Sequence, residues 1–171
     1  MVRRAKLVND IVELVPILQL FSTNLYKNVY ETLLSEWLTF NELKGRFGEG
    51  VEEALKILKH AGMLEVKWRM PSDPAGKPEK EYHVSYTHIS ANFYAPLKDL
   101  NKILEVVFMP DDEFEETVQK IINEVKAGRM SVQHISKSLG LDPIIIRAVA
   151  KKSLKLNLKG QLVELAKEEE L

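Results

Sequence analysis

Cysteine is absent from the 171-residue sequence. Disulfide bonds, zinc fingers, iron–sulfur clusters and thiol catalysis all depend on this residue, so its absence excludes all four. A chain that cannot form disulfides fits a reducing compartment, and we therefore expect the protein to be cytoplasmic.

Long hydrophobic runs are also missing. The basic N-terminus is followed by an apolar stretch that Asn9, Asp10, Glu13 and Pro16 interrupt. This stretch is too short for a membrane span, and it lacks the continuous apolar region of a signal peptide. We therefore expect no membrane association.

No charge of one sign dominates the composition. The 24 Lys and Arg residues are balanced by 25 Asp and Glu residues, which gives a formal net charge of -1. Such a chain lacks the basic field of an abundant nucleic-acid coat protein, so any nucleic-acid binding must come from a local patch. With 45% hydrophobic residues, the length suffices for a core and favours two small modules over one large one.

Helical periodicity begins close to the N-terminus. The apolar residues at helical spacing are Ile11, Leu14, Val15, Leu18 and Phe21. Further apolar residues lie on the other faces of this segment, so the helix needs burial on more than one side. A second helix with one apolar face is predicted over residues 25–34.

The next segment has the signals of a helix-turn-helix. Thr39 can cap a new helix, and Glu42, three residues on, can complete a capping box. Gly48 and Gly50 permit a tight reversal, after which an apolar stripe predicts a helix over residues 51–62. Two helices joined by a glycine turn form a helix-turn-helix.

A β-hairpin is predicted directly after this unit. Residues 63–70 and 82–88 alternate between apolar and polar side chains, which is typical of strands. The intervening residues 71–78 contain three prolines and a glycine, which favour an exposed loop. A hairpin in this place is the wing of a winged helix-turn-helix domain.

The predicted helix-turn-helix and the hairpin after it resemble the ArsR-type regulators of bacteria and archaea. The resemblance covers about half the chain and rests on "LTFNELKGRF", then "VEEALKILKHAGMLEVKWR", then a polar hairpin. Within it, "LKHAGMLE" is similar to the segment in which that family leaves its recognition helix and enters the wing. The resemblance implies a DNA-binding transcriptional regulator that pairs through helices flanking the winged domain.

The second half of the chain repeats the pattern of the first. A shift of 92 positions places Thr39 on Ser131 and Gly48 on Gly140, so both cap-to-glycine intervals are nine residues. Asp142 is then a plausible N-cap for another helix. The sequence therefore predicts a second helix-turn-helix.

Three other segments complete the predicted organisation. Residues 90–109 have the pattern of a strong amphipathic helix, and the acidic run 111–116 begins the next helix. Residues 155–165 fit a short hairpin around Gly160, and a helix from Gln161 onward fits almost as well. The acidic run at 168–170 is predicted to be a solvated tail.

These patterns predict a mainly α protein with small β-hairpins (α+β). We expect tandem winged helix-turn-helix-like modules joined by an amphipathic helix. The predicted parts are an N-terminal module over residues 1–92, a linker and dimerisation helix over 93–112, and a C-terminal module over 113–171.

The predicted partner is double-stranded DNA. Phosphate contacts come from Lys and Arg, and the second module has cations without acids from Ile144 to Leu158, where Arg147, Lys151 and Lys155 are predicted to form an outer basic ridge. The candidate nucleic-acid-binding residues are Arg147, Lys151, Lys152, Lys155, Lys56, Lys59, Arg69, Lys77 and Lys80.

Surplus hydrophobicity predicts a homodimer. The first helix and the helix that ends near Phe108 carry more apolar residues than one face of a small domain can bury. The candidate interface residues are Ile11, Leu14, Leu18, Leu100, Leu104, Val107 and Phe108. A two-fold dimer would present two reading heads to a pseudo-palindromic site.

Metal binding and catalysis have little support in the sequence. The four histidines, His60, His83, His88 and His134, are scattered. No catalytic set or phosphate-binding loop occurs at recognisable spacing, so we expect neither an enzyme nor a cofactor. We expect Trp37 and Trp68 to fill the core or to face the strands, and not to stack on bases.

A protein-interaction role is the main alternative. Tandem winged domains could act as a subunit of a transcription, replication or proteolytic assembly. Glu49, Glu52 and Glu53, near the start of the first predicted recognition helix, favour that role because they would oppose phosphates, whereas the basic ridge opposes it. RNA binding ranks lower, because aromatic residues are not interleaved with basic ones.

Overall fold

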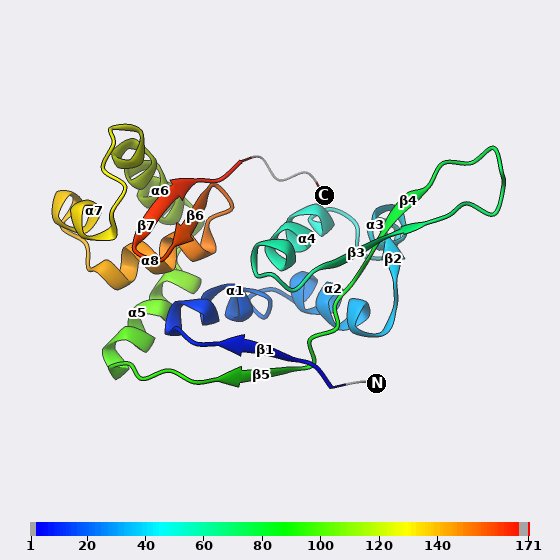
Figure 1. Ribbon diagram of the computed structural model, residues 1–171, viewed down its shortest axis with the longest axis horizontal. Helices are drawn as coiled ribbons and strands as arrows, with labels where there is room; N and C mark the ends of the chain where they lie inside the picture. Colours follow the sequence, from blue (N-terminus) through cyan, green and yellow to red (C-terminus); the bar gives the residue numbers. More distant parts are fainter. Residues whose placement is uncertain (1–2, 168–170) are drawn as a thin grey trace. The chain divides into compact units, whose positions relative to one another are not determined.

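The computed structural model describes residues 3–167 and 171 (Figure 1). It divides into two compact units. Unit 1 comprises Met1–Val8 and Leu20–Ala91, and unit 2 comprises Asn9–Gln19 and Asn92–Leu171. The predicted tail at 168–170 lies outside the described residues.

Unit 1 contains the predicted helix-turn-helix and its hairpin. Its elements are β1 (Ala5–Val8), α2 (Asn24–Ser35), β2 (Leu38–Thr39), α3 (Phe40–Phe47), α4 (Val51–His60), β3 (Glu65–Arg69), β4 (Glu79–His83) and β5 (His88–Ala91). Strands β2, β4 and β3 form an antiparallel sheet in that order. Figure 1 shows the hairpin of β3 and β4 extending away from the helices. Helix, strand, two helices and hairpin in this order form a winged helix-turn-helix.

Local chemistry explains why α3 and α4 begin where they do. The Thr39 hydroxyl accepts a hydrogen bond from the amide of Glu42 at 3.2 Å, and the Glu42 carboxylate accepts from the amide of Thr39 at 2.8 Å. This reciprocal capping box confirms the prediction. Gly50 precedes α4 with φ of +93°, and an added Cβ there would come within 2.5 Å of Leu25. Only glycine fits this turn.

Residues 88–91 differ from the prediction. They form β5, which pairs in parallel with β1, and the helix predicted from residue 90 begins only at Leu97. The short run at 88–91 is too brief to separate strand from helix by periodicity, and its partner strand lies more than 80 positions away in the sequence.

Unit 2 consists mainly of helices. Its elements are the 3-10 helix η1 (Ile11–Glu13), α1 (Leu14–Gln19), α5 (Leu97–Val107), α6 (Asp111–Lys126), α7 (Val132–Leu139), α8 (Pro143–Lys152), β6 (Leu156–Lys159) and β7 (Leu162–Leu165). Strands β6 and β7 form a hairpin that turns at Gly160. The hairpin, and not a helix, therefore follows α8.

The elements from α6 to β7 repeat the order found in unit 1. Ser131 forms an isolated bridge with Leu162 of β7, in the place that β2 has beside β4. The Ser131 hydroxyl caps α7 by accepting from the amide of His134 at 3.1 Å. This order agrees with the predicted repeat, and its interpretation as a second winged module stays a prediction.

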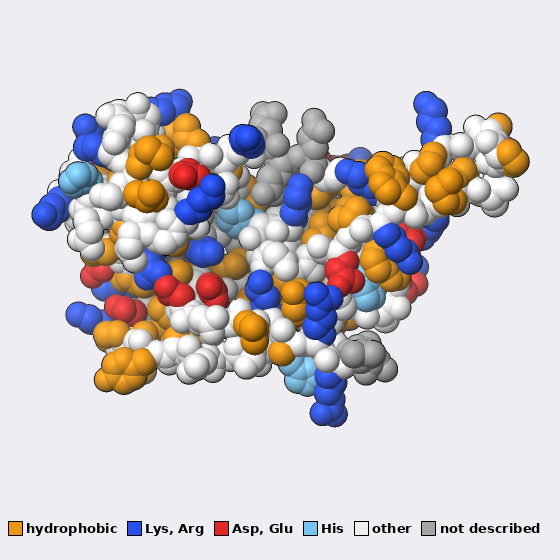
Figure 2. All heavy atoms as spheres, viewed as in Figure 1, with side chains coloured by type: hydrophobic (Ala, Val, Ile, Leu, Met, Phe, Trp, Pro, Cys, Tyr) orange, Lys and Arg blue, Asp and Glu red, His pale blue; other side chains and the backbone are white. Residues whose placement is uncertain are grey.

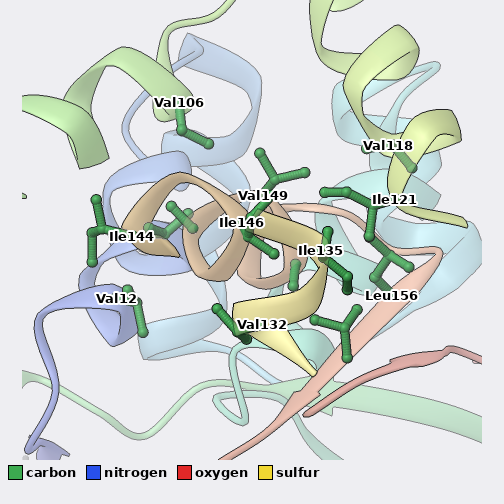
Figure 3. Close-up of a cluster of buried hydrophobic side chains, with 14 of the residues drawn as sticks. Val12, Val106, Val118, Ile121, Val132, Ile135, Ile144, Ile146, Val149 and Leu156 are labelled. Carbon is green, nitrogen blue, oxygen red and sulfur yellow. The ribbon is translucent and has the colours of Figure 1, made fainter. Parts of the chain in front are cut away.

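Helix α8 lies at the centre of unit 2. It contacts α1 and α5 as well as α6, α7 and β6. Figure 3 shows Ile146 and Val149 of α8 within a buried cluster that also includes Val12 from η1 and Val106 from α5. Because η1 and α1 contribute to this core, residues 9–19 belong to unit 2 and not to the predicted N-terminal part.

Replacing Ile146, which is fully buried, with alanine should lower the free energy of unfolding by about 2–5 kcal/mol, because it removes buried methyl groups and leaves a cavity. Urea titration followed by circular dichroism measures this loss. Gln133→Ala, at an exposed position on α7, is the control and should change stability by less than about 0.5 kcal/mol. Equal losses in the two variants would contradict the central place of α8.

Candidate nucleic-acid interface

The exposed face of α4 carries both signs of charge. Its apolar residues are buried, and Glu52, Glu53 and Lys59 are exposed, with Lys56 and His60 half-buried. The Lys56 ammonium lies 3.0 Å from the Glu52 carboxylate one turn away. Since Glu52 and Glu53 lie in the first turn, they also suit the positive end of the helix dipole.

Other cations of the helix-turn-helix are paired as well. The Arg46 guanidinium donates to both oxygens of Glu36, at 2.6 and 3.1 Å. Lys44 lies 3.6 Å from Glu49. Basic side chains around α3 and α4 therefore lie beside acidic ones, so the surface of these helices is close to neutral.

The wing, which we define as β3, β4 and the loop 70–78, is fixed to α3 by Arg69. Its guanidinium donates to Glu42 at 2.7 Å, to Glu81 at 2.6 Å and to the carbonyl of Trp37 at 3.1 Å. Burial raises the pKa of the Glu81 carboxyl, but hydrogen bonds from Arg69 and Lys67 outweigh this effect and hold the pKa below its ordinary value. Arg69, a predicted DNA contact, therefore has structural partners.

The loop of the wing is ordered by its own hydrogen bonds. The Asp73 carboxylate accepts from the amide of Ala75 at 3.0 Å, and its carbonyl accepts from the amide of Gly76 at 2.9 Å. Lys77 is exposed in this loop. Lys80 on β4 places its ammonium 5.6 Å from the centre of the Trp68 ring.

Trp68 lies on the outside of the wing and not in the core, which is one of the two places predicted for it. It is 61% exposed, and Val66 and Met70, at alternate positions of the same segment, are also exposed. Figure 2 shows hydrophobic side chains along the extended hairpin. Trp37, in contrast, stacks on His83 with ring centres 4.8 Å apart. The alternation of β3 is present, but its charged face contacts the helical side, where Lys67 lies over Trp37 and Arg69 donates to Glu42. The apolar face with Val66 and Trp68 is therefore the exposed one.

The predicted basic ridge of the second module does not form one exposed face, because Arg147 is largely buried. The Arg147 side chain is 18% exposed and forms an ion pair with Asp10, which also caps η1 by accepting from the amide of Val12. Helical spacing places Arg147 on the side of α8 that faces away from α6 and α7. In the structure, η1 and α1 cover the side of α8 on which Arg147 lies. The local pattern around α8 does not indicate this second layer, because Asp10 lies 137 positions away in the chain.

Lys152 caps the end of α5. Its ammonium donates to the carbonyls of Val106 and Val107 at 3.1 and 3.2 Å and lies 4.3 Å from the centre of the Phe114 ring. Burial lowers the pKa of this ammonium, and the nearby carboxylates of Asp111 and Glu115 oppose the shift. This structural role was not predicted.

The last two cations of the predicted ridge differ in exposure. Lys155 is exposed and lies 2.9 Å from the Glu115 carboxylate, whereas Lys151 is half-buried. The four predicted contacts of unit 2 therefore do not form one exposed surface. Lys56 and Lys59 lie on α4, and Lys77 and Lys80 lie in the wing.

The predicted dimer residues divide into buried and exposed sets. Ile11 and Val107 are buried in the core of unit 2, and Leu14 and Leu18 pack against it. Leu100, Leu104 and Phe108 remain exposed, and Leu97 shares their spacing along α5. We call Leu97, Leu100, Leu104 and Phe108 the α5 stripe. Figure 2 shows hydrophobic side chains near the start of α5.

Metal binding and membrane insertion each need a particular structural feature. No group of three or more His, Asp or Glu residues among them could hold a metal ion. Within the same residues, no helix has the length and apolar character needed to cross a membrane.

Comparison with protein families places this fold and its exposed helix α4 in context. The sequence model of the ArsR transcriptional regulator family matches residues 8–167. The chain therefore belongs to the ArsR transcriptional regulator family, and the match includes both units. No curated protein matches the chain.

Asp10→Asn should destabilise unit 2, because it keeps the polar cap of η1 but removes the charge that compensates the largely buried Arg147. We expect the free energy of unfolding to fall by about 1–3 kcal/mol in urea titration. The control is Glu116→Gln, which removes an exposed ion pair with Lys120 and should cost less than about 0.5 kcal/mol. A change no larger than that of the control would show that Arg147 does not depend on Asp10.

Proposed function

We propose that this transcriptional regulator binds double-stranded DNA as a dimer and reads it with α4 of unit 1. The observation that carries the proposal is the exposed polar face of α4 in a complete winged helix-turn-helix, with a wing beside it. A recognition helix of this kind enters the major groove, and its side chains contact the edges of the bases. Membership of a transcriptional regulator family supports this role.

The phosphate contacts of this proposal come from α4 and the wing. Lys56 and Lys59 lie on the exposed side of α4, and Lys77 and Lys80 lie in the wing. We do not assign DNA contacts to Arg147 or Lys152, because their charged groups are engaged inside unit 2. Unit 1 then supplies the contacts to DNA.

The acidic residues of α4 set the character of the interface. Glu52 and Glu53 weaken binding to any polyanion, so non-specific affinity is low. A carboxylate can accept a hydrogen bond from the amino group of cytosine, so the same residues favour particular bases. The near-neutral face therefore suits a reader that discriminates between sequences better than a general DNA-coating protein.

The second copy in the dimer packs on the α5 stripe. These four side chains share one face of an amphipathic helix and are exposed, and such a face usually marks a partner surface. Unit 2, which we interpret as a second winged module with a buried α8, acts as the platform that carries this stripe. The protein acts in the cytoplasm by binding and not by catalysis.

A protein-interaction subunit is the second candidate function. The observation that favours it is the acidic start of α4, where Glu52 and Glu53 are exposed. In that case α4 would contact a basic protein surface, and the purified chain would have no measurable affinity for DNA at low salt.

Replacing both Lys56 and Lys59 with alanine should weaken DNA binding at least about tenfold at low salt and reduce the salt slope of log K by about two, because each lysine neutralises one phosphate. Fluorescence anisotropy with genomic DNA fragments selected by the protein measures both quantities. Lys120→Ala is the matched control, since Lys120 forms the same i,i+4 pair on α6 with Glu116 that Lys56 forms on α4 with Glu52.

Replacing Glu52, the acidic partner of Lys56, should have the opposite effect on DNA affinity. Glu52→Gln should raise affinity for random DNA by several-fold, because it removes a repulsive charge from the interface. Glu116→Gln should leave affinity unchanged. If neither the lysine nor the glutamate variants of α4 differ from their α6 controls, α4 does not face DNA.

Trp68 offers a native probe of the wing. If the wing lies against DNA, binding should change the emission of Trp68, because this ring is exposed and lies near Lys80. The chain has two tryptophans, so Trp68→Phe should abolish the DNA-dependent change and Trp37→Phe should preserve it. A signal that survives Trp68→Phe would mean that the wing does not approach DNA.

A further inference from the structure

The ribbon of β1 and β5 is an incomplete sheet. The two strands pair in parallel, with Ala5 opposite His88 and Val8 opposite Ala91, and no other described strand joins them. Parallel strands are normally found inside larger, covered sheets, and a sheet of two strands has marginal stability. All four residues of β5 are exposed. The ribbon therefore has the geometry of a sheet that lacks further strands.

The two free edges of the ribbon differ in charge. Beside β1 are Arg4, which pairs with Glu65 at 2.5 Å, and Lys6 within the strand. Charged side chains, Lys above all, protect strand edges from further pairing. Strand β5 contains no Lys, Arg, Asp, Glu or Pro, and its Ile89 side chain is 53% exposed. The unprotected edge is therefore that of β5.

We propose that β5 pairs with β5 of a second copy of this chain. The two strands run antiparallel about a two-fold axis and form a four-stranded sheet in the order β1, β5, then β5 and β1 of the second copy. Such an isologous contact uses one surface twice and closes after two copies. This inference rests on the proposed dimer and adds a second contact to it.

Two observations favour a second copy over a foreign peptide. An uncharged edge best accepts an uncharged strand, and β5 itself is such a strand. Only residues 92–96 separate β5 from α5, so the end of β5 and the start of α5 are at most about 22 Å apart. Once the α5 stripes hold two copies together, each β5 is tethered within reach of the other, which raises its effective concentration. A foreign peptide has no such tether.

The absence of cysteine allows a clean crosslinking test. Single-cysteine variants of the full chain, His88→Cys, Ile89→Cys, Ser90→Cys and Ala91→Cys, are oxidised and the covalent dimer is quantified. A disulfide needs Cα atoms within about 7 Å, so only the position nearest the two-fold axis pairs with itself. We expect a maximum at one or two adjacent positions, at least about tenfold above Glu116→Cys on the exposed surface of α6.

Sedimentation of the same reduced variants separates this inference from the dimer itself. A dimer in which none of the four positions crosslinks above the Glu116→Cys level overturns the β5 contact and leaves the α5 dimer intact. A chain that sediments as a monomer at micromolar concentration, without crosslinks, overturns both. Equal crosslinking at all four positions indicates random collision and also overturns the β5 contact.

A second variant tests the contact without disulfides. Ile89→Lys places like charges on both sides of the two-fold axis and should weaken the dimer about tenfold. Ile89→Thr keeps a β-branched, uncharged residue at the same position and should leave the dissociation constant within about threefold of the original chain. Equal dimer affinity in the two variants would contradict the proposed pairing.

Discussion

Burial of α8 is the constraint on which the organisation of this protein depends. The helix has apolar side chains on the side of α6 and α7 and also on the side of η1, α1 and α5. Both sides are covered within unit 2, so α8 holds the layers together and has no free face for a nucleic acid. The last helices of the two helix-turn-helix patterns therefore differ in exposure. In unit 1 the corresponding helix, α4, keeps an exposed polar side.

The placement of cations follows from the same constraint. Arg147 and Lys152 would be expensive to bury alone, and each has a compensating partner, an ion pair with Asp10 or two backbone carbonyls at the end of α5. In unit 1, Arg69 joins the wing to α3 through Glu42 and Glu81. Many of the basic residues thus support the fold, which explains why the total charge says little about the interface.

Local patterns in the sequence were sufficient for most of the helices. The Thr39 capping box, the turn at Gly48 and the repeat at Ser131 all depend on neighbours within a few positions. The features that the sequence analysis missed depend on residues far apart in the chain. They are the pairing of β1 with β5, the layer that covers Arg147, and the exposed side of Trp68. A single sequence does not show which distant segments pack together. Helical spacing therefore placed Arg147 on one face of α8, but it could not predict which element covers that face.

The proline-rich loop of the wing has a consequence for binding entropy. Pro71, Pro74 and Pro78 fix their backbone φ angles, and the hydrogen bonds of Asp73 hold the tip between them. A loop already restrained in the free protein loses little conformational freedom when it meets a ligand. The long hairpin can therefore reach outward without the ordering penalty that a flexible loop of equal length would impose.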